Sequence, residues 1–344
     1  MKSTPKSQNP QGPPSDDLGD QVWKFSYDKL AASVNIMLLY VLESKGSSPG
    51  RQGFKMAIAA DGTFTGTIGG GIMENKLVQK AKQMIAENET KVLLMWQHHD
   101  KEHTKDQSGM ICSGSQLNAF IPLSSAHKPI IETIAQNGQI SILLSPNGIA
   151  VHESSPQEKT HNLQFRSEKD WQYTEKLNER PVIHIIGGGH VSLALSELMC
   201  FLGFYSIVYD DRPELNTILQ NFFANEKIII PGYEQLAEYI NDCKNDYAVI
   251  MTLGYRTDKI AIKQLLNKEL FYLGMMGSDH KIETLLKELK AEGISPVSLK
   301  KIFTPVGINI YSRTTQEIAV SIAAEIIREK NKGLSTGRND RSLL

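Results

Sequence analysis

Residues 182–211, VIHIIGGGHVSLALSELMCFLGFYSIVYDD, decide the fold of the second half of this chain. The run VIHII predicts a buried strand at 182–186, a glycine turn follows at once, and an apolar helix is expected over 191–202. Gly203 is a residue type that commonly ends helices. A second strand is predicted at 205–210, so the stretch has the order of a βαβ unit.

The glycine turn has the features of a phosphate loop. Gly187 can make the tight turn after the strand, and Gly189 lets the backbone approach a pyrophosphate. The amides of the helix N-terminus, from Gly188 onward, would then face the phosphates. Ser192 takes the third small position of the motif, and Asp210 follows 21 residues after Gly189, where an acid suits the hydroxyls of a ribose. The alternative for the glycine turn is a βαβ unit that binds no ligand. The alternative for Asp210 is an acid at a solvated strand end.

His190 is expected on the first turn of this helix. A histidine there can donate to a phosphate, ligate a metal or transfer a proton, or it can simply cap the loop. The residue types leave these roles open.

The rest of the second half continues the alternation of strands and helices, which indicates a parallel sheet with helices on both faces. We therefore predict a Rossmann-like nucleotide-binding domain over 179–331 and a loose tail over 332–344. Its further strands are expected at 227–231, 247–253 and 271–276, and its further helices at 234–243, 258–267, 281–292 and 315–330.

The sequence of the first half predicts a mixed α+β domain over 23–178. Together with the Rossmann-like second half, this places the whole chain in the α/β class. Residues 153–180 are polar and are interpreted as a linker, or as a helix leading into the second domain. The segment after Gly71 has apolar residues at helical spacing. Strands are expected at 35–42, 55–60, 63–67, 92–96 and 116–121, and a hairpin at 139–144 and 148–152.

Three loops of the first domain are rich in glycine or other small residues. The run Gly69-Gly70-Gly71 offers backbone amides without side chains in the way, a suitable design for holding a large anionic ligand. Arg51 and Lys55 can add charge-assisted bonds to phosphate. The three loops are 46–56, 66–74 and 112–114.

Two further residues of these loops have two interpretations each. Glu74 is either a ligand contact or an acid that stabilises a helix start. Cys112 is either a buried free cysteine or a reactive thiol in a glycine-flanked loop. His98, His99 and His103 lack a recognised metal-site spacing, and no metal ligand is assigned.

Composition limits the class of protein. The formal net charge of −1 over 344 residues gives no general attraction to nucleic acid or to an anionic membrane. Three cysteines do not suggest a disulfide framework, and no apolar run is long enough for a membrane helix. Residues 1–22 are polar and are expected to form a disordered tail. A cytoplasmic protein is the resulting expectation.

Together these motifs resemble the XdhC/CoxI family, the accessory proteins of molybdenum hydroxylases such as xanthine dehydrogenase. Two details differ from the family pattern: Cys112-Ser113-Gly114 stands where the family has CGG, and Gly50 separates Arg51 from the GSSP proline. The matching segments are GSSPGRQGFKM (46–56), DGTFTGTIGGGIME (61–74), CSG (112–114), HIIGGGHVSLAL (184–195), YDDRPE (209–214), LGMMGSDHK (273–281) and TPVGINIYSRTTQEIAVSIAAEII (304–327).

The resemblance implies a chaperone more than a turnover enzyme. Family members bind the molybdenum cofactor, a pyranopterin phosphate sometimes extended by a nucleotide, protect it during sulfuration and help to insert it. The implied partners are a xanthine-dehydrogenase-type molybdenum hydroxylase and a cysteine desulfurase, and the implied assembly is a homodimer. Two alternatives remain from the glycine loop alone: an NAD(P)-dependent oxidoreductase and a non-catalytic nucleotide sensor.

Overall fold

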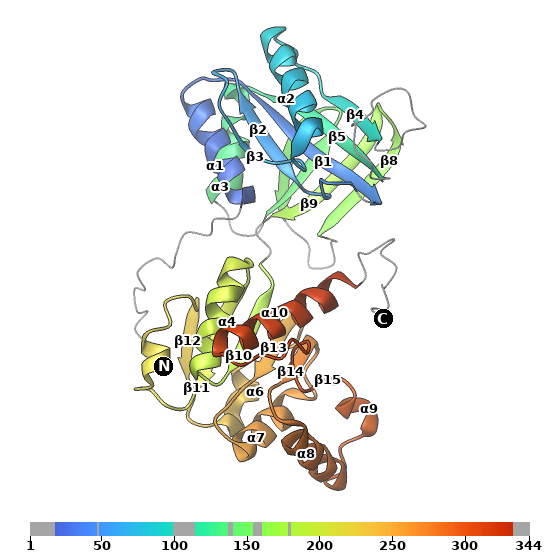
Figure 1. Cartoon of the computed structure of the whole chain (residues 1–344). Coiled ribbons are helices and arrows are strands. Elements are labelled where there is room, and N and C mark those ends of the chain that lie inside the picture. The colour runs from blue at the N-terminus through green and yellow to red at the C-terminus, as the bar shows by residue number, and fades with distance from the viewer. Residues whose placement is uncertain are drawn as a thin grey trace. The chain divides into compact units, whose positions relative to one another are not determined.

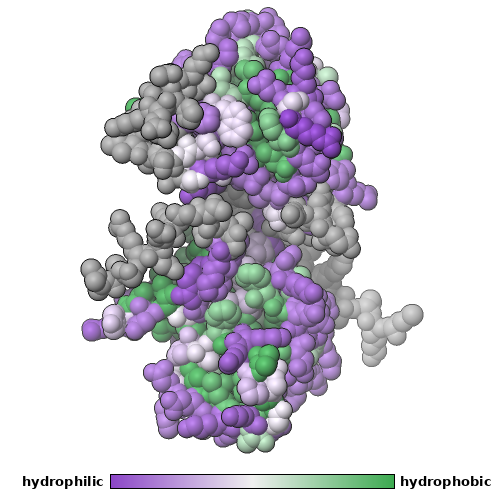
Figure 2. Space-filling model, turned by 90° about the vertical axis from the view of Figure 1, so that its right-hand side faces the viewer, coloured by the Kyte–Doolittle hydropathy of each residue, from purple (hydrophilic) through white to green (hydrophobic). Residues whose placement is uncertain are grey.

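The computed structural model describes residues 18–46, 48–98, 114–136, 140–153, 160–177 and 180–332. They belong to two compact units that divide between residues 179 and 180 (Figure 1). We call these the N-terminal unit and the C-terminal unit. Figure 2 shows that hydrophobic residues form patches between hydrophilic ones on the visible face of each unit.

The N-terminal unit contains two antiparallel sheets. The five-stranded sheet has the order β3-β2-β1-β5-β4 and the four-stranded sheet the order β7-β6-β9-β8. The strands are β1 (Ile36–Gly46), β2 (Lys55–Ala59), β3 (Phe64–Gly66), β4 (Leu93–His98), β5 (Gly114–Leu123), β6 (Ile140–Ser145), β7 (Gly148–Glu153), β8 (His161–Ser167) and β9 (Asp170–Leu177). The helices are α1 (Leu18–Ala31), α2 (Gly71–Ala86), the 3-10 turn η1 (Ser125–His127) and α3 (Lys128–Gln136).

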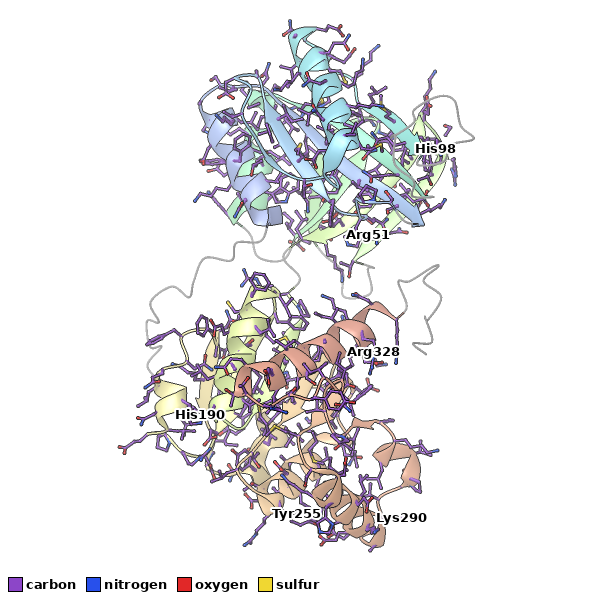
Figure 3. All side chains as sticks on the ribbon, in the orientation of Figure 1. Arg51, His98, His190, Tyr255, Lys290 and Arg328 are labelled. Carbon is purple, nitrogen blue, oxygen red and sulfur yellow. The ribbon has the colours of Figure 1, made fainter. Side chains whose placement is uncertain are left out.

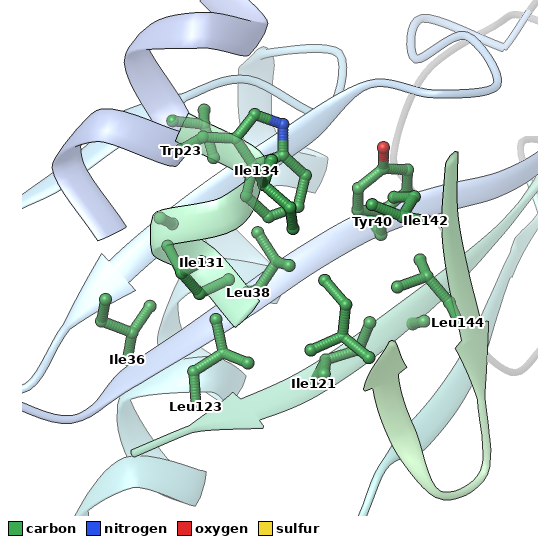
Figure 4. Close-up of a cluster of buried hydrophobic side chains, with 14 of the residues drawn as sticks. Trp23, Ile36, Leu38, Tyr40, Ile121, Leu123, Ile131, Ile134, Ile142 and Leu144 are labelled. Carbon is green, nitrogen blue, oxygen red and sulfur yellow. The ribbon is translucent and has the colours of Figure 1, made fainter. Parts of the chain in front are cut away.

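Strand β1 is the centre of this unit, and it explains why residues 36–42 are continuously apolar. Successive side chains of a strand point to opposite faces, and both faces of β1 are covered. Leu38 and Tyr40 pack with α1, α3 and the four-stranded sheet, as Figure 4 shows for part of this cluster. Leu39 and Val41 pack with α2 on the other face. The predicted strand is confirmed at the position expected.

Two predictions for this unit are wrong. Residues 161–177 form the hairpin of β8 and β9, neither a linker nor a helix. In β9 the side chains of Trp171, Tyr173 and Glu175 are buried while their neighbours are more exposed, an alternation of period two inside a polar segment. Residues 18–22 were expected to belong to the disordered tail, but they form the start of α1. Val22 and residues that follow it bury one face of that helix.

The C-terminal unit contains a six-stranded parallel sheet with the order β12-β11-β10-β13-β14-β15. This confirms the Rossmann-like prediction. The strands are β10 (Val182–Ile186), β11 (Tyr205–Asp210), β12 (Glu226–Ile229), β13 (Cys243–Ile250), β14 (Leu270–Met275) and β15 (Ile302–Phe303). The helices are α4 (His190–Phe201), α5 (Asn216–Leu219), the 3-10 turn η2 (Tyr233–Gln235), α6 (Leu236–Tyr239), α7 (Tyr255–Leu265), α8 (Asp279–Ala291), α9 (Pro296–Leu299) and α10 (Thr315–Asn331).

Each face of the parallel sheet has its own core. Helices α4 and α10 lie side by side on one face, where Leu195 and Ile322 pack against Ile185 (Figure 1). Helices α6, α7 and α8 supply the core of the other face, around Ile186 and Ile250. The expected helix at 234–243 is shorter than predicted and consists of η2 and α6, which end at Tyr239. Cys243 is already the first residue of β13.

Candidate functional site

The glycine loop of the C-terminal unit lies at the carboxyl end of β10, beside the place where the strand order reverses between β10 and β13. Ligands bind at such switch points in open α/β sheets. Gly187 has a φ of 106°, and a Cβ there would lie 2.5 Å from the carbonyl oxygen of Met251. A Cβ on Gly188 would lie 2.4 Å from Cδ1 of Ile218. Gly187 is therefore required by the protein's own backbone packing, whereas a side chain at Gly188 would require the Ile218 side chain to shift.

Gly189 differs from its two neighbours. It is the N-cap of α4, its φ of −72° is accessible to any residue, and no heavy atom lies within 4 Å of the position a Cβ would take. Its Cα is thus open on that side, next to a helix N-terminus whose first amides have no intrahelical acceptor. This is the arrangement in which a phosphate can approach backbone N–H groups.

The carboxylate of Asp210 holds the glycine loop in place through a hydrogen bond to its backbone. Its side chain is fully buried, and Oδ2 accepts hydrogen bonds from the Gly188 amide at 2.7 Å and from Arg212 Nη2 at 2.8 Å. Oδ1 accepts from the backbone N and the Nε of Arg212, at 3.0 and 2.8 Å. Burial alone would raise the pKa of the Asp210 carboxyl, but the bonds from Arg212 and Gly188 outweigh it and hold that pKa below its ordinary value.

A contact of Asp210 with a ribose stays a prediction. With four hydrogen bonds already accepted, a sugar hydroxyl would have to displace the Arg212 guanidinium. Thr217 Oγ1 adds a further brace by donating to the carbonyl oxygen of Gly188. The Gly188 peptide is thus held at both its amide and its carbonyl group, so the loop is preorganised.

His190 is the first residue of α4 and is exposed at the helix start (Figure 3). Its four possible roles stay open. Metal binding finds no support from neighbours, because the described residues contain no group of three or more His, Cys, Asp or Glu side chains that could hold an ion. Ser192 is buried, as its small size allows, and its hydroxyl has no hydrogen-bond partner within the described ranges.

Both glycine-rich loops of the N-terminal unit lie at one end of the five-stranded sheet. Antiparallel pairing brings the end of β1 at Gly46 to the start of β5 at Gly114, and the end of β4 at His98 to Ser115. Figure 3 shows Arg51 and His98 at this end. We define the glycine edge as loops 48–54 and 66–71 with the strand ends at residues 98 and 114. Cys112 lies outside the described residues, so both interpretations of it stay open.

The two loops of the glycine edge interlock through their backbones. A Cβ on Gly50 would lie 2.2 Å from the carbonyl oxygen of Ile68, and a Cβ on Gly69 would lie 2.5 Å from the amide nitrogen of Gly50. Approaches this close require glycine on both sides. The two motifs therefore form one structural element, although Ile68 lies 18 positions after Gly50 in the sequence.

Glu74 holds the triple-glycine run in place. Its Oε2 accepts from Thr67 Oγ1 at 2.6 Å and from the amides of Ile68 and Gly70, both at 2.9 Å. The run itself has positive φ throughout, with 75° at Gly70 and 72° at Gly71. This geometry agrees with the interpretation of Glu74 as a helix-start acid, while direct contact of Glu74 with a ligand stays a prediction. Gly70 and Gly71 are open on the side where a Cβ would be.

A buried polar network beneath the loops was not expected from the sequence. Ser48 Oγ donates to Gln116 Oε1 at 2.9 Å, and Gln116 Nε2 donates to the Ile68 carbonyl at 3.1 Å and to Asn118 Oδ1 at 2.6 Å. Asn118 Nδ2 continues the chain to Gln97 Oε1 at 3.2 Å. Polar residues two apart in an otherwise apolar strand, Gln116 and Asn118, were the available signal, because buried amides need partners.

The two cations proposed for phosphate binding differ in their surroundings. Lys55 Nζ lies 3.1 Å from Glu175 Oε1 and is largely buried, so it is already used inside the unit. Arg51 is exposed, and its side chain has no ion-pair partner among the described residues. Arg51 is therefore the cation that can meet an anionic ligand at the glycine edge.

A pocket of about 290 Å³ lies elsewhere in this unit. It is at the opposite end of the five-stranded sheet, lined by the start of β1 at Ile36 and the end of β5 at Leu123, and no residue of the glycine edge contributes to it. We therefore do not place the candidate site there. Among the described helices, none combines the length and the apolar character needed to cross a membrane.

Fold and loops define a class of protein: a Rossmann-type domain whose glycine loop is held by hydrogen bonds, preceded by an α+β domain with an interlocked pair of glycine loops. Two family models match the chain. The XdhC Rossmann domain matches residues 183–326, and the XdhC and CoxI family model matches residues 30–95. The chain belongs to the XdhC and CoxI family.

Two curated relatives extend over most of the chain. The uncharacterized protein YqeB of Escherichia coli is 25% identical over 292 residues, which cover 85% of this chain and 43% of YqeB. This chain thus spans less than half the length of that relative. A probable xanthine dehydrogenase subunit of Bacillus subtilis is 22% identical, and the match covers 86% of this chain and 93% of that protein.

A solved structure shares the fold. The crystal structure of a xanthine dehydrogenase from Bacillus halodurans superposes with a TM-score of 0.65 at 22% sequence identity. The match covers 93% of this chain and 97% of that one. At this level of identity the likeness supports the two-unit architecture.

Proposed function

We propose that this protein binds the molybdenum cofactor and delivers it to a xanthine-dehydrogenase-type molybdenum hydroxylase. Family membership and the name of the Bacillus subtilis relative, a probable xanthine dehydrogenase subunit, support the association with such an enzyme. A cysteine desulfurase as second partner and a homodimer as the assembly belong to the same proposal. So does a cytoplasmic location.

The observation that carries the cofactor part is that each unit has a helix start preceded by an open glycine. Gly70 precedes α2 and Gly189 precedes α4, and no heavy atom occupies the Cβ position of either. Helix N-termini bind anions, and the cofactor carries phosphate. The residues present therefore fit the phosphate part of the cofactor, with Arg51 as an additional charge at the glycine edge.

The chain's own residues account for binding and holding. Asp210 and Thr217 fix Gly188, and Glu74 fixes Gly70, so the amides that follow at the starts of α4 and α2 are preorganised and little entropy is lost when a ligand binds. The molybdenum centre would be supplied by the bound cofactor itself. We assign no reaction step to this protein, and delivery would require only release to a partner that binds the cofactor more tightly.

Purification from a molybdenum-replete host tests this function. We expect molybdenum and pterin to copurify with the protein, and we expect activation of a cofactor-free hydroxylase when the loaded protein is added. A protein that carries neither molybdenum nor pterin, and that does not activate the hydroxylase, would contradict the proposal.

An NAD(P)-dependent oxidoreductase is the second candidate, favoured by the Rossmann-type loop itself. It requires a ribose contact near Asp210, whose oxygens already accept four hydrogen bonds. Titration with NADH and NADPH, followed by a test for hydride transfer, separates it from cofactor delivery. Nucleotide-dependent binding of a partner without cofactor release would instead indicate a sensor.

A further inference from the structure

A cluster of ionisable side chains lies between the sheets of the N-terminal unit, at the side of the glycine edge. At its centre Glu175, on β9, is buried and accepts hydrogen bonds from the hydroxyls of Tyr40 and Tyr173, both at 2.7 Å. Lys55 Nζ lies 3.1 Å from the other carboxylate oxygen. Figure 4 shows Tyr40 with its hydroxyl at the margin of the apolar cluster. The proposed function uses none of these groups.

The protonation states of the cluster follow from its surroundings. Burial would raise the pKa of Glu175, but Lys55 and the hydrogen bonds outweigh burial and lower that pKa to about 2, so the group is a carboxylate. Burial, followed by the charge of Glu175, raises the pKa of Tyr40 and of Tyr173, so both remain neutral phenols. A carboxylate can only accept hydrogen bonds. Each tyrosine therefore donates its single proton to Glu175.

This sequence of donors fixes the tautomer of a histidine. The Tyr173 oxygen, having given its proton to Glu175, can only accept from His161 Nδ1, which lies 2.9 Å away. The same Nδ1 lies 3.4 Å from Glu175 Oε2. Nδ1 of His161 therefore carries the ring proton, and in the neutral ring Nε2 presents a lone pair. A histidine oriented in this way through Nδ1 is a common arrangement for bases and ligands in proteins.

His161 also lies next to the glycine edge. Its side chain is 33% exposed at the start of β8. A Cβ on Gly53 would lie 2.8 Å from Cε1 of His161, the ring carbon bonded to Nε2. Gly53 belongs to loop 48–54, two residues after the exposed Arg51. The imidazole ring thus borders the loop that we propose to contact the cofactor.

We propose that His161 is a ligand contact and base of the glycine edge, accepting through Nε2 a hydrogen bond from an N–H or S–H group of the bound cofactor. Where that group is acidic, its proton passes to Nε2 and the ligand atom keeps the electron pair. Glu175, close to Nδ1, offsets the charge of the resulting imidazolium, and Lys55 balances Glu175 when the ring is neutral. Tyr173 is the positioning residue. This inference rests on the proposed function.

Two amide variants separate the two nitrogens of the ring. Asparagine places an amide where Nδ1 lies, so His161→Asn keeps a donor to Tyr173 and loses Nε2. We expect this variant to unfold at the wild-type temperature and to retain about tenfold less cofactor, the effect of one lost hydrogen bond to the ligand. His161→Gln reaches further and keeps an acceptor near the Nε2 position, and it should retain more cofactor than His161→Asn.

Nuclear magnetic resonance of protein labelled with ¹⁵N-histidine tests the geometry without a ligand. We expect the Nδ1–H tautomer for His161 in the wild-type protein and a mixture of tautomers in Tyr173→Phe. Wild-type cofactor retention by His161→Asn, or an Nε2–H tautomer in the wild-type protein, would overturn the inference while leaving the proposed function intact. A wild-type protein that retains no cofactor would instead refute the proposed function, and this ligand role with it.

Discussion

Alanine at Gly187 should lower the stability of the protein, whereas alanine at Gly189 should leave stability nearly unchanged and weaken ligand binding, although the residues are two positions apart. At Gly187 the φ of 106° costs an alanine about 1–2 kcal/mol, and its Cβ would lie 2.5 Å from the Met251 carbonyl oxygen. Relief of that contact requires backbone movement, so we expect a total loss of about 2–4 kcal/mol in the free energy of unfolding.

Alanine at Gly189 meets no such obstacle. Its φ of −72° is ordinary and its Cβ position is open, so alanine should gain about 0.4–1 kcal/mol by restricting the unfolded chain. Because Gly189 is the N-cap of α4, where alanine is less favourable than glycine, this gain is largely cancelled, and Gly189→Ala should stay within about 0.5 kcal/mol of wild-type stability. The added methyl group would, however, occupy the side from which a phosphate approaches the loop. We expect cofactor retention to fall at least about tenfold, the effect of about 1.4 kcal/mol.

Urea unfolding followed by circular dichroism measures the first effect, and the molybdenum-to-protein ratio after purification measures the second. Gly189→Ala is its own control for folding, because a protein of near wild-type stability that has lost its ligand has lost a binding surface and not its structure. Wild-type retention by Gly189→Ala would show that no ligand approaches there. Unchanged stability of Gly187→Ala would refute the packing argument for the turn.

Substitutions at four residues test the N-terminal unit. The pKa of Glu175 is lowered to about 2, so the ionised carboxylate stabilises the folded state fully above about pH 4.5, and this stabilisation is lost as the pH falls toward 2. Across that pH range the free energy of unfolding of the wild type should fall by on the order of 3 kcal/mol more than that of Glu175→Gln, as measured by acid unfolding. At neutral pH that variant should be destabilised, since Lys55 loses its partner, and Lys55→Met should restore part of the loss. Glu74→Ala removes the hydrogen bonds that Glu74 accepts from Thr67, Ile68 and Gly70, so the free energy of unfolding should fall by about 1–3 kcal/mol and cofactor retention should fall; Glu74→Gln, which keeps an acceptor oxygen, should be milder. Arg51→Ala should change stability by less than about 0.5 kcal/mol yet weaken retention in a salt-dependent manner; unchanged retention at low salt would remove Arg51 from the site.

The C-terminal unit was predictable because its signals are local. Continuous apolar strands such as 182–186, a glycine turn and an apolar helix follow one another directly, and the parallel sheet follows from their order. The hairpin at 161–177 was missed because only alternate residues of β9 are buried, and one of them, Glu175, is charged. A charged residue at a buried strand position can be recognised from the sequence only if its partners can be identified. The partners of Glu175 include Tyr40 on β1 and Lys55 on β2, which are distant in the sequence.

The candidate site divides in the same way. The residue types of the loops were evident, and the structure confirms that His190 lies on the first turn of the helix after the glycines. The ligand contacts of these residues stay predictions. Their individual roles were not evident, because they depend on long-range contacts. That Asp210 would brace Gly188, and that Gln116 would connect two loops, required a knowledge of which strands are neighbours.

The interlocked glycines, Gly50 and Gly69, carry a consequence for how such sequences diverge. A Cβ on Gly50 would meet the carbonyl oxygen of Ile68, and a Cβ on Gly69 would meet the amide nitrogen of Gly50, so neither position can change unless the opposite loop moves away. Relatives should therefore keep glycine at both positions or replace both loops together. A chimera that exchanges only one of the two motifs between distant relatives should misfold at this edge, whereas an exchange of both as a pair should be tolerated.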